Sequence, residues 1–519
     1  MKTLGPVLLA LAALTLAAGP SLAACPAGAP LGLFKGANEA SGADRIEVIL
    51  NLVCANGAYL AELFTSQSDL KVTETAGSAD AVRLAFEGFS GPGAASLQLS
   101  GERLSGVFNV GLDKGALNLT RSGPPLAPGS QAPTLKLTTA QWREDLAALA
   151  TELPRRHANA FYRLPKAKFE AQVAALDRRL PKLDGDQAFV ALEQLANAIG
   201  DGHTGVIFPP DRRILPLQFA RFGADIRVVA AGPGFDRALG ARVERIGKTP
   251  IADAWRLALT LTPQDELMPL REGRALSYLR SGMLLHGLGV ITERDHATLT
   301  LRSDAGRPFT VALQGAEPGL APPLAPTVRG EGLAQRNPGK AFWCEDLPLQ
   351  QAVYCDFRAY QNIGRAALDL FALIDKSHPK KLIIDMRENG GGDNTLGYGL
   401  LIRPLKVHAD INRKGGLYVL VGAQTFSAAM NNAAQFQDET QAILVGEPIG
   451  EKPNSYQEPR QFRLPNSHLI VRASSLYYEF RKHGPNVVAP DKTITPTWAD
   501  VKAGRDPVLD WVLAQPAPN

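Results

Sequence analysis

Residues 381–392 read KLIIDMRENGGG, and this stretch decides the fold of the C-terminal part of the chain. Its first half, KLIID, is a short apolar run typical of a strand that is buried on both faces. Two more such runs follow, and helical stretches lie between them: GLYVLVG at 416–422, AILVG at 442–446, and helices near 395–403 and 427–437. Strands that alternate with helices indicate a parallel sheet, so we expect an α/β core over residues 341–519.

The glycines that end this strand mark a candidate site. Consecutive glycines, here Gly390, Gly391 and Gly392, let backbone N–H groups approach a ligand and form an anion-binding concavity. No Gly-Lys-Ser/Thr follows, which argues against a nucleotide P-loop. The alternative interpretation is a tight strand-to-helix turn without chemistry.

Two further segments carry candidate chemistry. Ser427, in QTFSAAM, follows the next strand and precedes a helix, where the helix N-terminus stabilises developing negative charge. The segment is not a G-x-S-x-G elbow, and a simple helix N-cap is the alternative. His203, in DGHT, follows a helix end and suits proton transfer near neutral pH, although a structural hydrogen bond would also explain it.

The remaining chain divides into segments by its patterns. Over residues 24–121, apolar and polar residues alternate in short runs that are separated by Gly-rich turns. This pattern predicts an all-β domain, either a small meander barrel or a sandwich. Apolar residues at helical spacing predict three helices over 134–210, with Thr138 and Gln141 as a capping box. Residues 211–314 return to short strands, and the stretch 238–251 resembles the segment of PDZ domains that closes one strand and opens the next. Proline-rich residues 122–133 and 315–340 are predicted linkers.

The N-terminus and the cysteines indicate export. Residues 1–23 have a basic start, an apolar run and a small-residue cleavage pattern, as in a secretory signal peptide. The four cysteines form two plausible disulfides, Cys25 with Cys54 and Cys344 with Cys355. Alternatively, Leu22–Cys25 resembles a lipoprotein box, and only lipidation of Cys25 would attach the mature chain to a membrane. We expect a periplasmic or secreted protein.

Composition excludes several classes. With 519 residues the chain is long enough for about three domains, and 45% hydrophobic and 20% charged residues exclude a fully disordered chain. A net charge of +4 is too balanced for a nucleic-acid binder. The cysteines and the scattered histidines lack zinc-ligand spacing, and nothing in the sequence implies a metal or another cofactor.

The motifs together resemble a known family. DGHT, DMRENGGG, TFSAAMN, the stretch GEPIGEKPN at 446–454, and LPNS at 464–467 occur in the order seen in the tail-specific (C-terminal-processing) and tricorn-like serine proteases. The resemblance covers roughly residues 140–510. It implies a ClpP/crotonase-like α/β protease core with helical and PDZ-like segments, and a peptide or protein substrate.

The resemblance also implies roles for residues. Ser427 would be the nucleophile, with backbone N–H groups of Ala428 and of Gly390 or Gly391 as oxyanion donors. The general base would be His203, as in the tricorn-like branch, or Lys452, which lies 25 residues after the serine as in the other branch. Lys452 departs from that branch because a glutamate precedes it and favours its charged form.

A glutamate would complete the site. Glu458 is the expected partner that orients the base, and Glu447 and Glu451 compete for this role. We therefore interpret the chain as an exported serine peptidase that uses Ser427 and His203. A non-catalytic relative that binds peptides or apolar ligands, and an esterase for small esters, are the rival interpretations.

Overall fold

The computed structural model describes residues 24–40, 46–65, 69–88, 91–110, 113–130, 132–326 and 332–518. The chain divides into two compact units, Met1–Gln131 and Ala132–Asn519. The predicted signal peptide, residues 1–23, lies outside the described residues. Within the described ranges, no helix has both the length and the hydropathy needed to span a bilayer.

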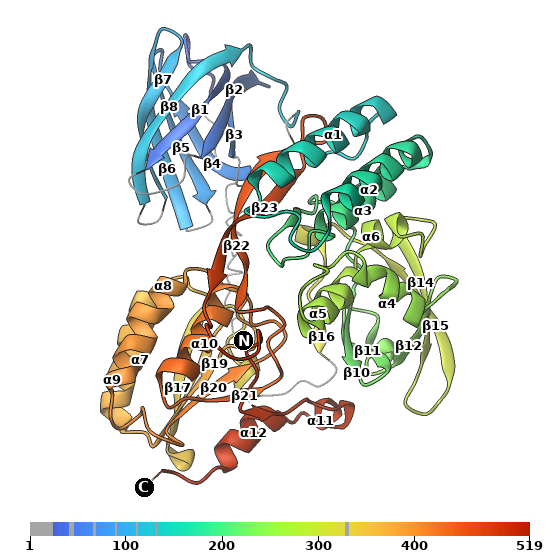
Figure 1. Ribbon diagram of the computed structural model, residues 1–519. Coiled ribbons are helices and arrows are strands. Elements are labelled where there is room, and N and C mark those ends of the chain that lie inside the picture. The colour runs from blue at the N-terminus through green and yellow to red at the C-terminus, as the bar shows by residue number, and fades with distance from the viewer. Residues whose placement is uncertain are drawn as a thin grey trace, which may run out of the picture. The chain divides into compact units, whose positions relative to one another are not determined.

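The first unit contains a closed barrel of eight antiparallel strands in chain order (Figure 1). The apolar residues of the predicted alternating pattern fill the barrel interior. Leu50, Leu52, Val82, Leu84 and Phe86 are all buried in the barrel core. The predicted all-β domain is thus confirmed, and of the two forms left open, barrel or sandwich, the structure has the barrel. Its last strand runs two residues into the stretch expected to be a linker. The strands are β1 (Gly32–Ala40), β2 (Glu47–Ala55), β3 (Ala58–Thr65), β4 (Asp69–Gly77), β5 (Ala81–Gly88), β6 (Gly91–Ser100), β7 (Arg103–Val110) and β8 (Asp113–Gly123).

Both expected disulfides are present. Cys25 pairs with Cys54 in the first unit, and Cys344 pairs with Cys355 in the second. The second bond joins residues that lie directly opposite each other on neighbouring antiparallel strands. Because the Cys25 sulfur is held in a disulfide, it is not available for a lipid thioether, and the lipoprotein alternative is not supported.

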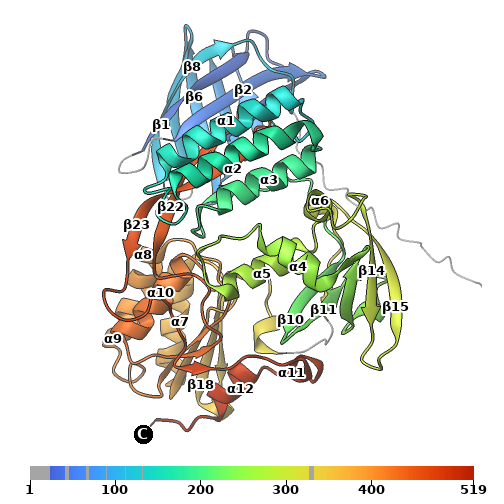
Figure 2. The ribbon, with the colours of Figure 1, turned by 45° about the vertical axis from the view of Figure 1, so that its right-hand side comes forward.

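The second unit begins with three helices that lie side by side (Figure 2). They are α1 (Thr139–Arg156), α2 (Lys166–Arg179) and α3 (Gly185–Asn197). The predicted capping box is present, because the Thr138 side chain accepts from the Gln141 backbone and Gln141 accepts from Thr138. The apolar stripes of all three helices meet in one core, which also includes residues of the C-terminal hairpin described below.

An antiparallel sheet of seven strands follows where a PDZ-like segment was expected. Its path is β10-β11-β12-β14-β15, and β13 and β16 pair at its side. The strand β16 lies inside the proline-rich stretch expected to be a linker and pairs with β11. The likeness of this segment to a PDZ domain stays a prediction. The elements are β10 (Leu217–Phe222), β11 (Asp225–Ala231), β12 (Arg242–Ile246), β13 (Thr249–Pro250), β14 (His296–Arg302), β15 (Pro308–Gln314), β16 (Ala325–Pro326), α4 (Ile251–Leu259), α5 (Met268–Tyr278) and α6 (Gly282–Gly287).

The six-stranded sheet that positions the site has the order β17-β18-β19-β20-β21-β24, in which all neighbours except β17 and β18 run parallel. Alternate residues of its strands face two different cores. Ile384 and Val419 pack with α7 and α10, whereas Ile383 and Leu420 pack with α12. The elements are β17 (Phe342–Leu347), β18 (Ala352–Phe357), α7 (Ile363–Ser377), β19 (Lys381–Asp385), α8 (Asn394–Gly397), a π-helix (Tyr398–Ile402), α9 (Arg403–Val407), β20 (Leu417–Val421), α10 (Ala428–Glu439), β21 (Ile443–Gly446), β24 (Lys492–Thr493), α11 (Trp498–Lys502) and α12 (Pro507–Ala514).

A long hairpin connects this sheet region with the three helices. Its strands are β22 (Asn454–Arg463) and β23 (Ile470–Glu479), and Figure 1 shows it reaching toward α1. The short strand β9 (Gly205–Val206), directly after the DGHT motif, pairs with β23. The hairpin therefore holds the DGHT loop beside the C-terminal part of the chain.

We expect Ile384→Ala to lower the free energy of unfolding of the second unit by about 2–5 kcal/mol, because Ile384 is 0% exposed in the core of the parallel sheet. All five tryptophans lie in this unit, so tryptophan fluorescence during urea unfolding reports on it alone. The control Leu368→Ala, at a residue that is 69% exposed, changes the value by less than about 0.5 kcal/mol. Equal effects of the two variants would contradict the described core.

Candidate active site

Ser427 lies in the turn between β20 and the N-terminus of α10. Its backbone has φ 56° and ψ −126°, a conformation that costs energy for a residue with a Cβ and that clusters at functional sites. Thr425 holds this turn against the neighbouring strand end, because its buried hydroxyl donates to the Met386 carbonyl at 2.8 Å. Since β19 and β20 are parallel neighbours, their carboxyl ends meet at one edge of the sheet.

The glycine turn after β19 packs directly against Ser427. Asn389 is fully buried and shapes this turn, because its side-chain oxygen accepts from the Gly391 N–H at 3.0 Å and its carbonyl accepts from the Phe426 N–H at 3.0 Å. Gly391 has φ +105°, and a Cβ there would lie 2.7 Å from the Ser427 Cβ. Only glycine fits at this close approach.

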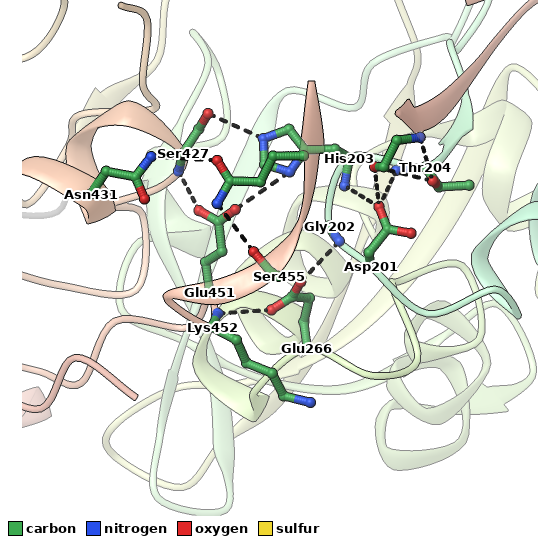
Figure 3. A network of polar contacts seen from close by, with 12 residues as sticks. Asp201, Gly202, His203, Thr204, Glu266, Ser427, Asn431, Glu451, Lys452 and Ser455 are labelled. Carbon is green, nitrogen blue, oxygen red and sulfur yellow. Dashed lines mark hydrogen bonds and ion pairs between the residues drawn. The ribbon is translucent and has the colours of Figure 1, made fainter. Parts of the chain in front are cut away.

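His203 contacts the serine hydroxyl. Its Nε2 lies 3.1 Å from the Ser427 Oγ (Figure 3). Its ring stacks on Phe426, with 4.7 Å between the ring centroids. The side chain is 10% exposed. Burial lowers the pKa of His203 to about 3, although the nearby Asp201 carboxylate favours the charged form. The ring is therefore neutral at neutral pH and able to accept a proton.

Glu451 lies on the other side of the histidine ring and is fully buried. Its Oε1 is 3.4 Å from the His203 Nδ1, and its Oε2 accepts from the Ser427 backbone N–H. Burial raises the pKa of Glu451 well above its ordinary range, and the neighbouring Glu266 raises it further. One carboxyl group thus contacts both the histidine ring and the backbone of the serine.

Asp201 fixes the loop that carries His203. Its Oδ1 accepts from the backbone N–H groups of His203 at 3.1 Å and Thr204 at 2.9 Å, and from the Ser474 hydroxyl at 2.5 Å. Its Oδ2 lies 2.9 Å from the Nε2 of His157, and both side chains are almost completely buried. Because the Asn159 N–H donates to the His157 Nδ1 at 3.0 Å, the His157 proton is on Nε2 and points at Asp201.

Two residues expected at the site lie outside this group of contacts. Lys452 points its side chain away from Ser427 (Figure 3), and its Nζ pairs with Asp265 at 2.8 Å. Glu458 is exposed on β22, where it accepts from the Tyr478 hydroxyl at 3.2 Å. The alternation of the strand explains this, because Ser455 and Gln457 face inward. The expected contact between Glu458 and the base is therefore absent, and Glu451 occupies that position.

Sequence reasoning gave no role to several residues of this network. Asp201 could have been found from the sequence, because it belongs to the DGHT motif and lies two residues before the candidate base His203. Glu266 and His157 belong to no recognisable motif. Only the fold places Glu266 beside the Gly202 N–H and His157 beside Asp201. Among the residues that the structure describes, no group of three or more His, Cys, Asp or Glu side chains is arranged to hold a metal ion.

No family model and no curated protein matches this sequence. Solved structures do match it. The structure of mature CPAF complexed with lactacystin is 13% identical, with a TM-score of 0.51 over 72% of this chain and 97% of that chain. A crystal structure of mature CPAF is 14% identical, with a TM-score of 0.50 over 72% and 96%.

The photosystem II D1 C-terminal processing protease is also similar, at 16% identity and a TM-score of 0.34 over 69% of this chain and 94% of that chain. At these identities the likeness to mature CPAF shows a shared fold. The crystal structure of the tricorn protease is similar as well, at 12% identity and a TM-score of 0.37 over 90% of this chain and 50% of that chain.

We expect Gly391→Ala to lower the melting temperature and to displace Ser427, because the added Cβ would lie 2.7 Å from the serine Cβ and 2.9 Å from the Phe426 carbonyl oxygen. The control is Gly364→Ala in helix α7, where a Cβ meets nothing within 4 Å. Thermal unfolding and the rate at which a fluorophosphonate labels Ser427 measure the two effects. Wild-type behaviour of Gly391→Ala would refute the close packing.

Proposed function

We propose that the protein is a serine peptidase in which Ser427, His203 and Glu451 act as a catalytic triad. The observation that carries this proposal is the continuous line of contacts from the Ser427 Oγ through the two ring nitrogens of His203 to Glu451, at 3.1 Å and 3.4 Å. A serine hydroxyl is a weak nucleophile without an adjacent base, and this arrangement supplies one. The shared fold with mature CPAF supports the same conclusion.

The proposed reaction follows from the protonation of the histidine. His203 is neutral, with its proton on Nδ1 toward Glu451, so Nε2 accepts the Ser427 hydroxyl proton while Oγ bonds to the peptide carbonyl carbon. The C–N bond then breaks, and Nε2 returns this proton to the leaving amine. Water repeats the sequence on the acyl-enzyme and releases the acid. Glu451 stabilises the charge that His203 gains in both steps.

Two backbone N–H groups are proposed to hold the oxyanion. Ala428 is the first residue of α10, so its N–H belongs to a helix N-terminus next to the nucleophile. The Ser427 N–H donates to Glu451 and the Gly391 N–H donates to Asn389. Of the two glycines considered from sequence, Gly390 is therefore the better second donor.

The substrate is proposed to be a peptide or protein, and the working compartment to be oxidising. Two disulfides, Cys25–Cys54 and Cys344–Cys355, support a location outside the reducing cytosol. Export to the periplasm or secretion is part of this proposal. The segment 211–314 is proposed to be PDZ-like within the tail-specific protease architecture.

Ser427→Ala and His203→Ala are each expected to abolish hydrolysis of a casein or peptide substrate, because they remove the nucleophile and its base. Lys452→Met is expected to retain most of the activity, because its amine is paired with Asp265. Steady-state rates and melting temperatures of the three variants test this. A dead Lys452→Met with an active His203→Ala would overturn the assignment of the base.

Glu451→Gln is expected to lower kcat by about 10²–10⁴-fold, since an amide cannot stabilise the imidazolium with a negative charge. The matched control is Glu458→Gln, which changes an exposed glutamate in the following strand and leaves kcat unchanged. If the Glu458 variant alone lost activity, Glu451 would not be the third member of the triad.

A further inference from the structure

A short segment before α5 lies between the two loops that carry His203 and Glu451. The Asp265 N–H donates to the Gly200 carbonyl at 2.9 Å, next to DGHT, and the Leu267 N–H donates to the Gly450 carbonyl at 3.0 Å, next to Glu451. The approach on the second side is close, because a Cβ on Gly450 would lie 2.0 Å from the Leu270 nitrogen. The segment thus belongs to the seven-stranded sheet region in sequence but packs on the candidate site.

Glu266 is the central residue of this segment, and its carboxyl group joins the two loops. Its Oε1 accepts from the Gly202 N–H at 2.9 Å, and its Oε2 accepts from the Lys452 N–H at 3.1 Å. Gly202 directly precedes His203, and Lys452 directly follows Glu451 (Figure 3). Glu266 is 7% exposed, so these two backbone groups take the place of water around a carboxylate.

We propose that Glu266 is a positioning residue, which sets the separation of His203 and Glu451 by binding the backbone beside each of them. This inference rests on the proposed peptidase function and adds a residue to it. A carboxyl group is rigid and planar, so the two N–H groups that it binds are held at a fixed distance. The His203 Nδ1 and the Glu451 Oε1 are 3.4 Å apart and form no hydrogen bond with each other, so their contact is electrostatic and a small displacement of either loop changes it.

The surrounding charges make the role of Glu266 electrostatic as well as geometric. The charged and titratable groups that face this pair of glutamates are Tyr162, Asp201, His203, Arg274 and Lys452. Burial raises the pKa of Glu266 to about 7, and its negative charge raises the pKa of Glu451. Removing that charge therefore lowers the pKa of Glu451 and lets it ionise at lower pH.

Glu266→Gln tests both effects. An amide has one oxygen and can accept from only one of the two N–H groups, so kcat is expected to fall at least tenfold while KM changes less than twofold. For the activity that remains, kcat/KM is measured as a function of pH. The acid limb of this profile is expected to move to lower pH, because the pKa of Glu451 falls when the charge of Glu266 is removed. A role in folding alone would lower the melting temperature and leave the pH profile in place.

Two further variants make the result decisive. Glu266→Asp keeps the charge on a shorter side chain, so it is expected to lower kcat without moving the acid limb. Glu272→Gln makes the same chemical change in the neighbouring helix α5, where the glutamate pairs with Arg221 at 2.7 Å, and is expected to behave as wild type. If Glu266→Gln does not fold, the Asp variant decides the geometric part of the proposal.

The outcomes separate this inference from the proposed function. Activity that survives in Ser427→Ala would refute the peptidase triad. If Ser427→Ala is inactive and Glu266→Gln keeps wild-type kcat and pH profile, the triad stands and only the role of Glu266 is wrong. The rate of fluorophosphonate labelling of Ser427 gives a second readout that needs no peptide substrate, and it is expected to fall in Glu266→Gln and not in Glu272→Gln.

Discussion

The complete burial of Glu451 is the constraint on which the candidate site depends. A carboxyl group without water must be compensated by hydrogen bonds or by a change of charge, because leaving it unpaired costs several kcal/mol. Glu451 takes one backbone N–H from Ser427 and faces the ring of His203. These contacts require three distant parts of the chain to meet at one point, and the architecture of the second unit can be understood as the means of bringing them together.

A different structural element positions each of these three parts of the chain. The parallel neighbours β19 and β20 place the glycine turn beside Ser427, because their carboxyl ends share one edge of the sheet. The hairpin β22–β23 follows Glu451 in the chain and pairs with β9, which follows His203. Backbone pairing therefore fixes the base close to its partner, and side chains such as Asp201 then adjust the loop. None of these devices is local in sequence.

This division explains how far sequence reasoning reached. Features set by neighbouring residues were predictable: the capping box of Thr138 and Gln141, the helical stripes, the alternating barrel strands and the buried strand KLIID. Ser427 and His203 were predictable because their motifs are short and ordered. Which glutamate lies beside His203, Glu451 or Glu458, was not predictable from the sequence. It depends on where β22 begins and hence on which of its side chains face inward. Lys452 failed as a neighbour of the serine for a related reason, because its partner Asp265 comes from another segment.

The electrostatics of the site hold His203 neutral at rest, so in the proposed reaction it gains a charge only when it accepts the serine proton. Burial lowers the pKa of His203 and raises that of Glu451, so the environment disfavours the charged form of each group when it stands alone. An imidazolium beside a carboxylate is a different case, because in a site without water the two charges attract each other strongly. In the proposed reaction, the proton that leaves Ser427 turns His203 into an imidazolium as the oxyanion forms. This new charge then faces a Glu451 carboxylate that has already lost its own proton. A buried Glu451 held by the Ser427 backbone N–H is thus suited, in the proposed reaction, to stabilise the transition state more than the resting state, which is the requirement for catalysis.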